Sequence, residues 1–286
     1  MAMIEPVTLF SAYLATKAMN SKAAAKLVEC LRQSAAWYFA PLQEVRMARA
    51  RAQTALIEDD TRTEIERRAL TRVLFNETRR QKNIDDTLRF TVDVLPSTDD
   101  ISDEPIGPDW LVQFFACVQD ISNEQLQRVF ASILANEIVK PGRCSRRTLD
   151  LLKNLEQSEA ATFTTACSIA VHTPDFGFVA IPDGRAHGLP VQGLDLPLLR
   201  ACGLLTLQPV DNLSFWPGAI LHLCDGGRLR IGQRGAEMAF IVFTTAGREL
   251  AQVVRCAAPQ LVRQKVVETL RHWYTDMEIV DPIVQE

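Results

Sequence analysis

A chain of 286 residues is longer than most single domains, so its length predicts one large domain or two modest ones. Apolar residues make up 47% of the chain and charged residues 23%, and both fractions are typical of a soluble globular protein. The net charge of -4 excludes a generally basic nucleic-acid coat and an acidic disordered tail, but it leaves local basic patches open.

The amino-terminal sequence MAMIEPVTLFSAYLATKAMN does not have the pattern of a secretion signal. No basic residue precedes its apolar run, and Glu5 and Pro6 stand at the head of that run. The run is too short to span a bilayer, and no other stretch approaches about 18 uninterrupted apolar residues. We therefore expect a cytoplasmic protein without a membrane span.

The first 95 residues predict long helices. Residues 8–39 are rich in Ala, Leu, Lys and Met, which are good helix formers, and they predict one or two helices. The tract 42–95 contains neither Gly nor Pro and predicts the longest helix, or a helical hairpin. Within it, Glu64 and Arg68 stand four residues apart, at the spacing of a stabilising ion pair on a helix.

The same tract raises the question of nucleic-acid binding, because Arg46, Arg49 and Arg51 cluster near its start. Acidic residues that follow them, such as Glu58 and Asp59, dilute the positive field. We therefore favour a solvated amphipathic helix. Residues 96–108 (PSTDDISDEPIGP) form an acidic, Pro-containing linker that lacks the calcium-loop pattern of alternating ligands and a closing Glu.

Residues 109–170 predict a compact helical bundle with short connections, because apolar residues recur there at helical spacing. The Ser122–Gln125 spacing is that of a capping box, and Pro141–Gly142 predicts the end of a helix. Four residues of this range are expected to cap helix N-termini: Asp109, Ser122, Ser145 and Ser158. Farther along the chain, Thr244 or Thr245 is expected near the N-cap of another helix.

The stretch DWLVQFFACVQDISNEQLQRVFASILANEIVKPGRCSRRTLDLLKNL resembles the central signature of the bacterial domain of unknown function 2806 family. That signature has the order D-W, F-F, a break, L-A-x-E, and then P-G-x-x-S-x-R-T-L. Phe130 stands where the family usually has Trp, and Asn136 stands where it usually has Gly. The resemblance covers residues 41–170 and implies a mostly helical fold with an α+β end, without assigned catalytic residues. A looser similarity to abortive-infection and other phage-defence proteins is analogy alone.

One cluster inside this signature is not explained by packing. Arg143, Arg146 and Arg147 gather at the start of a predicted helix, where the helix dipole disfavours positive charge. Glu137 follows an apolar stripe and either points toward the bundle or is a boundary residue that pairs with Arg146 or Arg147. These four residues form a candidate interaction patch.

Residues 171–286 change to short apolar runs with frequent Gly and Pro, which predicts a smaller α+β part. The succession PLLRACGLLTLQPV, GGRLRIG and FTTAGREL is similar to the end of a winged helix, with a hairpin turn at Asp225–Gly226–Gly227. Winged helices bind DNA or protein. The candidate nucleic-acid contacts are few for strong phosphate binding, and they are Arg200, Arg228, Arg230 and Arg234.

A search for chemistry finds no nucleophile elbow, phosphate loop or zinc spacing. The segment most similar to a metal-binding site contains His172, Asp175, Asp183 and His187. Its pattern is better explained by a turn-rich hairpin, because the spacing of a metal site is missing. Seven widely spaced cysteines predict buried free thiols rather than disulfides. We expect no catalytic residue, no metal site and no cofactor.

The fold class expected is therefore α+β and mostly α-helical, in four parts: 1–95, 96–108, 109–170 and 171–286. The function favoured is that of a non-enzymatic bacterial interaction protein that self-associates, since amphipathic helices need partners to bury their apolar faces. A component of phage defence or stress response is suggested by the resemblance alone. The alternatives are a DNA-binding regulator that uses the winged-helix-like part and a nuclease or hydrolase without a recognised motif.

Overall fold

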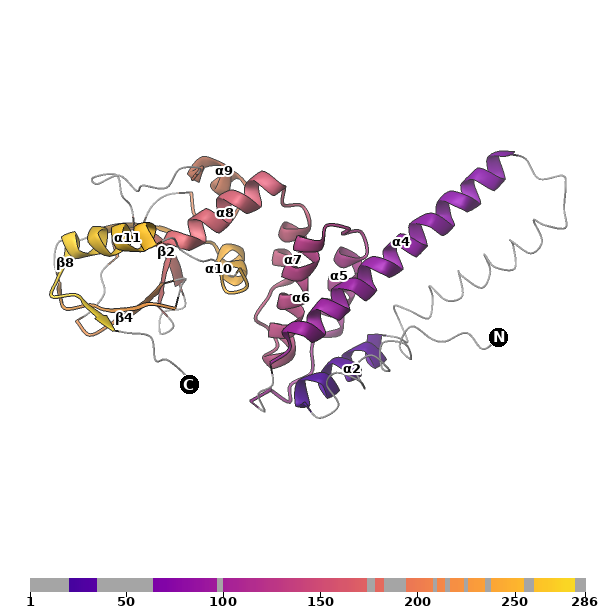
Figure 1. Ribbon diagram of the computed structural model, residues 1–286, viewed down its shortest axis with the longest axis horizontal. Coiled ribbons are helices and arrows are strands. Elements are labelled where there is room, and N and C mark those ends of the chain that lie inside the picture. Colours follow the sequence, from indigo (N-terminus) through magenta and orange to yellow (C-terminus); the bar gives the residue numbers. More distant parts are fainter. Residues whose placement is uncertain are drawn as a thin grey trace. The chain divides into compact units, whose positions relative to one another are not determined.

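The computed structural model shows an α+β fold that is mostly helical, as the sequence predicts (Figure 1). The chain divides into two compact units, Met1–Lys153 and Asn154–Glu286. Within the described ranges, no helix is both long enough and apolar enough to cross a membrane. The structure describes residues 21–34, 64–96, 100–173, 178–182, 194–207, 210–213, 217–223, 226–234, 238–254 and 260–280.

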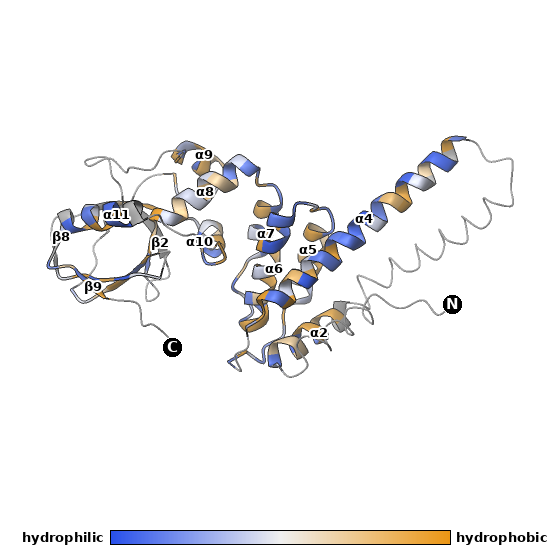
Figure 2. Ribbon diagram, in the orientation of Figure 1, coloured by the Kyte–Doolittle hydropathy of each residue, from blue (hydrophilic) through white to orange (hydrophobic). Residues whose placement is uncertain are grey.

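The N-terminal unit is a bundle of helices around α6. The long α4 packs along α6 and touches α5, while α7 packs against α5. Figure 2 shows α4 alternating between hydrophilic and hydrophobic residues along its length, as an amphipathic helix does. The described helices are α2 (Lys22–Ser34), α4 (Glu64–Val94), α5 (Pro108–Val118), α6 (Glu124–Val139) and α7 (Arg146–Lys153).

Aromatic side chains of α5 and α6 form the centre of this bundle. The ring of Phe114 stacks on Trp110 with centroids 5.3 Å apart and meets Phe130 edge-on at 6.0 Å. Phe115 also contacts Phe114 edge-on at 5.5 Å, and all four residues are buried. Such aromatic pairs each contribute about 0.5–1.5 kcal/mol beyond the area they bury. The Trp of the D-W element and both residues of the F-F element are therefore core residues.

The connection between α5 and α6 is fixed by side chains of α4. Arg79 and Arg80 both form ion pairs with Asp120, at 3.3 and 2.9 Å. Asn83 donates a hydrogen bond to the carbonyl of Gln119 at 2.8 Å. The described part of the longest predicted helix thus begins at Glu64 and is anchored from Arg79 onward. Arg46, Arg49 and Arg51, considered above as a nucleic-acid arm, lie outside the described residues.

Two predicted caps of the bundle are wrong by one or two residues. Asn123, not Ser122, caps α6, because its side chain accepts the backbone N–H of Leu126 at 3.0 Å. The Ser122 hydroxyl instead accepts hydrogen bonds from α4. The N-cap position of α5 is Gly107, which places Asp109 in the first turn of that helix.

The third wrong cap belongs to α8 (Gln157–Ile169), the first helix of the C-terminal unit. Glu156, not Ser158, occupies the N-cap position, and it forms a reciprocal capping box with Glu159. Carboxylates are acceptable at this position because the N-terminal dipole of a helix attracts negative charge. α8 packs against α9, α11 and β2, and the unit boundary at Lys153 therefore precedes α8, inside the range 109–170.

The C-terminal unit contains three further described helices and strands in two sheets. Among the described strands, seven form one antiparallel sheet in the order β3-β7-β2-β1-β4-β5-β9, and β6 pairs with β8. The helices are α9 (Leu196–Ala201), α10 (Thr245–Ala251) and α11 (Gln260–Trp273). The strands are β1 (Val171–Thr173), β2 (Phe178–Pro182), β3 (Val210–Leu213), β4 (Ile220–Leu223), β5 (Arg228–Arg230), β6 (Gln233–Arg234), β7 (Met238–Val242), β8 (Tyr274–Thr275) and β9 (Glu278–Val280).

The two faces of β1, β4 and β5 differ in burial. Val171, Leu221 and Leu229 are buried, whereas their sequence neighbours His172 and His222 are only partly buried. This alternation is the pattern of a sheet with one face toward the core. The predicted hairpin at Gly226–Gly227 is confirmed, since β4 and β5 pair in antiparallel register.

Part of the predicted winged-helix pattern is present. α9 is followed by the buried Leu204 and Leu205, and Leu205 forms a bridge with Phe243. Thr244 caps α10 by accepting the N–H of Gly247 at 3.1 Å, as predicted. The strand expected in the wing, β5, lies between β4 and β9 in the seven-stranded sheet. The winged-helix identity of this part stays a prediction.

Candidate functional site

The polar residues of the signature converge on one loop between α6 and α7. α6 ends at Val139, and Pro141–Gly142 follows, as the sequence predicts. Gly142 adopts a φ of 83°, a left-handed conformation that glycine reaches without steric cost. The direction of the chain into α7 is therefore set by this glycine.

The carboxylate of Glu137 accepts hydrogen bonds from the backbone of this loop. Its Oε1 accepts the N–H of Gly142 at 2.5 Å, and its Oε2 accepts those of Arg143 and Cys144 at 3.1 and 3.2 Å. The Glu137 side chain is only 2% exposed. A buried carboxylate is costly unless hydrogen bonds compensate, and three backbone donors do so here. Glu137 therefore points toward the bundle and binds the backbone of the loop, and its pairing with Arg146 or Arg147 stays a prediction.

Two further side chains fix the same loop. The indole Nε1 of Trp110 donates a buried hydrogen bond to the carbonyl of Cys144 at 2.7 Å. The Ser145 hydroxyl accepts the N–H of Thr148 at 3.3 Å, which confirms the predicted cap of α7. Ser145 and Thr148 also share a hydrogen bond between their hydroxyls at 2.9 Å. The D-W, L-A-x-E and S-x-R-T elements of the signature thus hold one rigid turn.

The arginines of this turn face solvent. Arg143, Arg146 and Arg147 are all exposed, and Arg146 lies 3.9 Å from the carboxylate of Asp109 on α5. At that distance, with both side chains more than half exposed, the ion pair contributes little. Within the described part of the chain, the guanidinium groups of Arg143 and Arg147 have no hydrogen-bond or ion-pair partner. The rigid turn therefore displays positive charge at a helix start.

Acidic side chains lie in the segment that precedes α5. The segment before α5 is joined to the end of α6, because the N–H of Ser102 donates to the carbonyl of Val139 at 2.9 Å. Its Asp103 and Glu104 are exposed, and Asp103 pairs with Lys22 of α2 at 2.8 Å. The hydrogen bond from Lys22 lowers the pKa of Asp103 below its usual value, so this carboxylate stays charged in mildly acidic solution.

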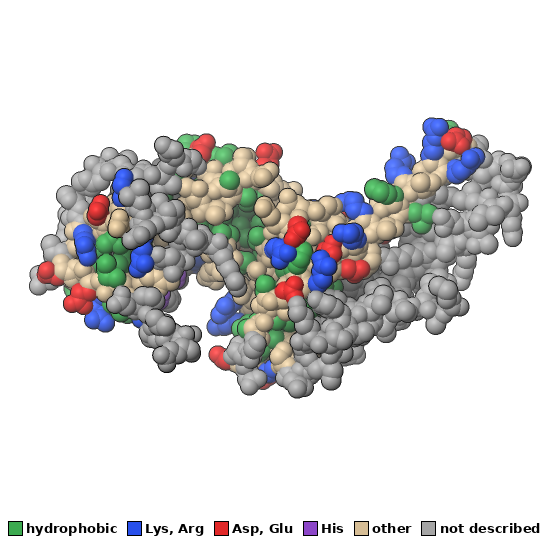
Figure 3. Space-filling model, in the orientation of Figure 1, with side chains coloured by type: hydrophobic (Ala, Val, Ile, Leu, Met, Phe, Trp, Pro, Cys, Tyr) green, Lys and Arg blue, Asp and Glu red, His purple; other side chains and the backbone are tan. Residues whose placement is uncertain are grey.

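We call this set the mixed-charge surface: Asp103, Glu104, Asp109, Arg143, Arg146 and Arg147. All six are exposed and belong to the N-terminal unit. Figure 3 shows the same character more widely, since acidic and basic side chains are interspersed over the face that it presents. Such a surface can bind a partner that carries both signs of charge.

The candidate nucleic-acid contacts of the C-terminal unit do not form one cationic cluster. Arg200 is partly buried and donates from Nε to the carbonyl of Thr206 at 3.2 Å. Arg228 and Arg230 lie on the same face of β5, and Arg230 pairs with Glu278 of β9 at 3.5 Å. Arg234 belongs to β6, and its side chain is outside the described part of the structure.

The histidine window predicted from sequence is only partly described, because Asp175, Asp183 and His187 lie outside the described residues. His172, on β1, instead lies opposite His222 on β4, with ring centroids 5.1 Å apart and an interplanar angle of 12°. Burial and the neighbouring His222 both lower the pKa of His172. Across the residues that the structure describes, no cluster of three or more metal-binding side chains is present.

The described cysteines are free thiols, as predicted. Cys30, Cys117, Cys144 and Cys167 are buried, and Cys202 is partly buried. Burial raises the pKa of Cys30, Cys117 and Cys202 to about 11, so these thiols are protonated near neutral pH. Protonated, buried thiols are poor nucleophiles and poor metal ligands.

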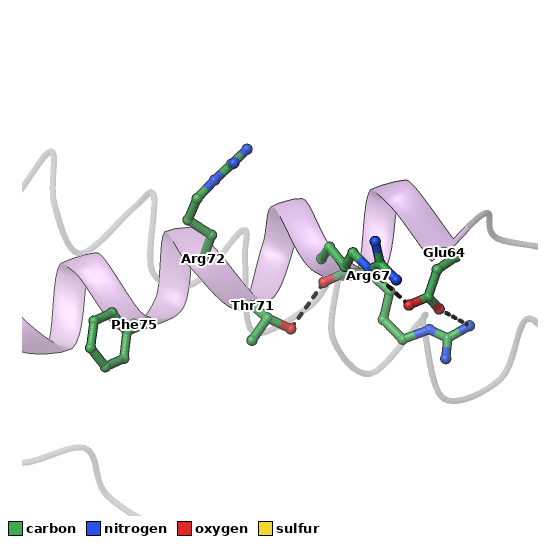
Figure 4. Close-up of a pocket in the computed structure, with 6 residues that line it drawn as sticks. Glu64, Arg67, Thr71, Arg72 and Phe75 are labelled. Atoms are coloured by element: carbon green, nitrogen blue, oxygen red, sulfur yellow. Dashed lines mark hydrogen bonds and ion pairs between the residues drawn. The ribbon is translucent and has the colours of Figure 1, made fainter.

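A shallow hollow lies along one side of α4 (Figure 4). The Glu64 carboxylate accepts a hydrogen bond from Arg68 at 2.9 Å, as the sequence spacing predicts, and pairs with Arg67 at 3.3 Å. Phe75 is 68% exposed. All the lining residues come from one helix, so the hollow is an open surface rather than an enclosed cavity. They are Glu64, Arg67, Arg68, Thr71, Arg72 and Phe75.

Comparison with known families agrees with the signature. Residues 67–177 match the model of a family described as protein of unknown function (DUF2806). This segment is similar to the DUF2806 family. The resemblance predicted from the signature is therefore confirmed, and the DUF2806 segment runs from α4 to just beyond β1. Searches of curated proteins and of solved structures found no significant match.

The DUF2806 signature thus acquires a structural meaning that the sequence did not supply. Sequence reasoning identified Glu137 and Ser145, but it missed the hydrogen bond from Trp110 to Cys144 and the role of Glu137 as a backbone acceptor. It also missed the hydrogen bond that joins the acidic linker to the end of α6. Complementary charge in the linker was the one available signal, since 96–108 contains no Lys or Arg.

Proposed function

We propose that this chain is a non-enzymatic interaction protein that associates with a second copy of itself through the mixed-charge surface. The observations that carry the proposal are the contact between Arg146 of α7 and Asp109 of α5 and the presence of further exposed arginines and carboxylates in the same unit. A two-fold interface needs a self-complementary patch, in which residue i contacts j and j contacts i. Arg146 and Arg147 of one copy can then meet Asp103 and Glu104 of the other.

The rigidity of the turn supports this use. Long arginine side chains lose conformational entropy when they bind, so a fixed backbone limits the additional ordering cost. Glu137 and Trp110 supply that fixed backbone through four hydrogen bonds. The hydrogen bonds of these signature residues stabilise the turn, which supports a role in display rather than in chemistry.

The expected dimer is weak and sensitive to salt. An exposed ion pair contributes about 0–1 kcal/mol, and salt screens it over roughly 8–10 Å. Val112, one turn beyond Asp109 on α5, is 39% exposed and can add apolar contact. Charge pairs of this kind set the choice of partner and the association rate more than the affinity.

Static light scattering after size exclusion tests the proposal. The wild-type chain is expected to show a concentration-dependent dimer at low salt that dissociates as salt is raised. Arg146→Glu with Arg147→Glu should abolish the dimer. The matched control is Arg67→Glu with Arg68→Glu on α4, which changes the same charge elsewhere and should leave it intact. A wild-type chain that is monomeric at low salt would refute self-association.

The alternative, a DNA-binding regulator, has weaker support. Arg228 and Arg230 share one face of β5, but Glu278 offsets Arg230 and a backbone carbonyl engages Arg200. A protein that neutralises several phosphates loses affinity steeply as salt rises. A salt series of binding to duplex DNA is the test, and absence of binding at low salt would end this alternative.

The biological process is a separate proposal. The resemblance to phage-defence proteins suggests a role in phage defence or stress response. Plating efficiency of phages on a bacterial strain that expresses the chain would test this role. Equal plating on strains with the wild type, the Arg146→Glu and Arg147→Glu variant, and no protein would count against it. The third alternative, a nuclease or hydrolase, gains no specific support.

A further inference from the structure

Two histidines from distant parts of the sequence form a cross-strand pair. His172 of β1 lies directly opposite His222 of β4 in antiparallel register. Side chains of directly opposed residues leave the same face of a sheet with Cβ atoms about 4.5–5.5 Å apart. The two imidazoles stack with centroids 5.1 Å apart. The pair is therefore held by the backbone of two hydrogen-bonded strands.

Imidazole is a common ligand of divalent transition metals. A neutral imidazole offers a nitrogen lone pair, which is the form that binds metal ions. Both side chains are only partly buried, so solvent and ions have access to this face of the sheet.

The separation also suits chelation. A transition-metal ion lies about 2.0–2.1 Å from an imidazole nitrogen, so two nitrogens on one ion stand roughly 3.3 Å apart in tetrahedral geometry. Two rings whose centroids are 5.1 Å apart can reach this spacing by turning their nitrogens toward each other. Rotation about side-chain bonds suffices, because the strands already fix the two Cβ atoms.

We propose that His172 and His222 form a two-histidine site for a divalent transition-metal ion, with water in the remaining coordination positions. Imidazole ligands favour Ni²⁺, Cu²⁺ and Zn²⁺ over Mg²⁺ and Ca²⁺. The register neighbour of His222 on β5 is Arg228, a positive group that weakens the attraction of a dication. The site is therefore weaker than one with three protein ligands, and it is lost as pH falls and protons compete.

Calorimetric titration of the full chain with Ni²⁺ tests the site. The wild type should bind one ion, and His172→Gln or His222→Gln should each weaken binding by at least about tenfold, since 1.4 kcal/mol is one tenfold step. His272→Gln, in α11, is the matched control and should bind as the wild type does. If a protein that carries both His172→Gln and His222→Gln bound Ni²⁺ as tightly as the wild type, the proposal would be overturned.

A second measurement needs no substitution. Diethyl pyrocarbonate modifies accessible imidazoles, and peptide mass spectrometry locates the modification. Ni²⁺ should protect His172 and His222 in the wild-type chain, while Mg²⁺ should not. Modification of both residues at an unchanged rate in saturating Ni²⁺ would overturn the site even if the substituted proteins fail to fold.

Discussion

At the residue scale, a few side chains fix the turn between α6 and α7. Both carboxylate oxygens of Glu137 accept hydrogen bonds from backbone N–H groups of the turn, and the indole of Trp110 donates a hydrogen bond to the carbonyl of Cys144. Trp110 and Cys144, which are 34 residues apart in the sequence, are thereby joined at one turn. The order of the signature reflects hydrogen bonds that a single loop requires.

Replacing Glu137 by Gln should destabilise the N-terminal unit. The amide keeps one acceptor oxygen, but its NH₂ group then faces backbone N–H donors in a buried place. An unsatisfied buried donor costs about 1–3 kcal/mol, so a loss of that size in the free energy of unfolding is expected from urea titration. Glu124→Gln, at an exposed position of α6, is the control and should change it by less than about 0.5 kcal/mol.

Two glycines should respond differently to Ala. At Gly142 a Cβ atom would have open space, so only its φ of 83° opposes the change, at about 1 kcal/mol. At Gly247 the new Cβ would overlap the carbonyl oxygen of Leu204, and backbone must shift. Thermal unfolding should show a clearly larger loss for Gly247→Ala, and the reverse order would contradict the packing described.

At the element scale, most helices could be predicted from helical periodicity and from the residues that begin and end helices. The long α4, the Pro141–Gly142 stop and the caps at Ser145 and Thr244 were predictable, since each depends on local sequence. The caps at Asn123 and Glu156 were not, because a neighbouring serine was an equally good local candidate. In the first case α4 decides the outcome by hydrogen-bonding Ser122 from a distant part of the chain.

Pairings between distant segments were not predictable. The contact of His172 with His222 depends on strand order in the sheet, which no local pattern encodes. The same holds for the hydrogen bond between Ser102 and Val139, which joins the acidic linker to the end of α6. Sequence reasoning identified the arginines of the candidate site and left their neighbours open.

The β1–β4 pair predicts a pH dependence. The pKa of His172 is lowered from its ordinary 6.5 in the folded chain, so the unfolded chain takes up a proton first as pH falls. The contribution of His172 to the free energy of unfolding is therefore fully present above about pH 6.5. It declines as pH falls toward the pKa of His172 in the folded chain. His172→Gln should reduce this decline in urea titrations from pH 7.5 to 5, without added metal. If the free energy of unfolding of His172→Gln fell with pH as steeply as that of the wild type, the prediction would be contradicted.

At the scale of the whole molecule, the N-terminal unit combines a packed helical core with the mixed-charge surface. Glu137 and Trp110 fix the turn that carries three exposed arginines, and three exposed carboxylates belong to the same unit. A surface of one sign would repel a second copy, whereas this one can satisfy both charges across a two-fold axis. Self-association is the simplest use of such an arrangement.

The most direct measurement of this claim mixes two charge-reversed proteins. One carries Arg146→Glu and Arg147→Glu, and the other carries Asp103→Arg and Glu104→Arg. Each alone is expected to elute as a monomer in light scattering at low salt, because like charges then meet across the interface. An equal mixture should regain the dimer. A mixture that stays monomeric while the wild type dimerises would show that the mixed-charge surface is not the interface.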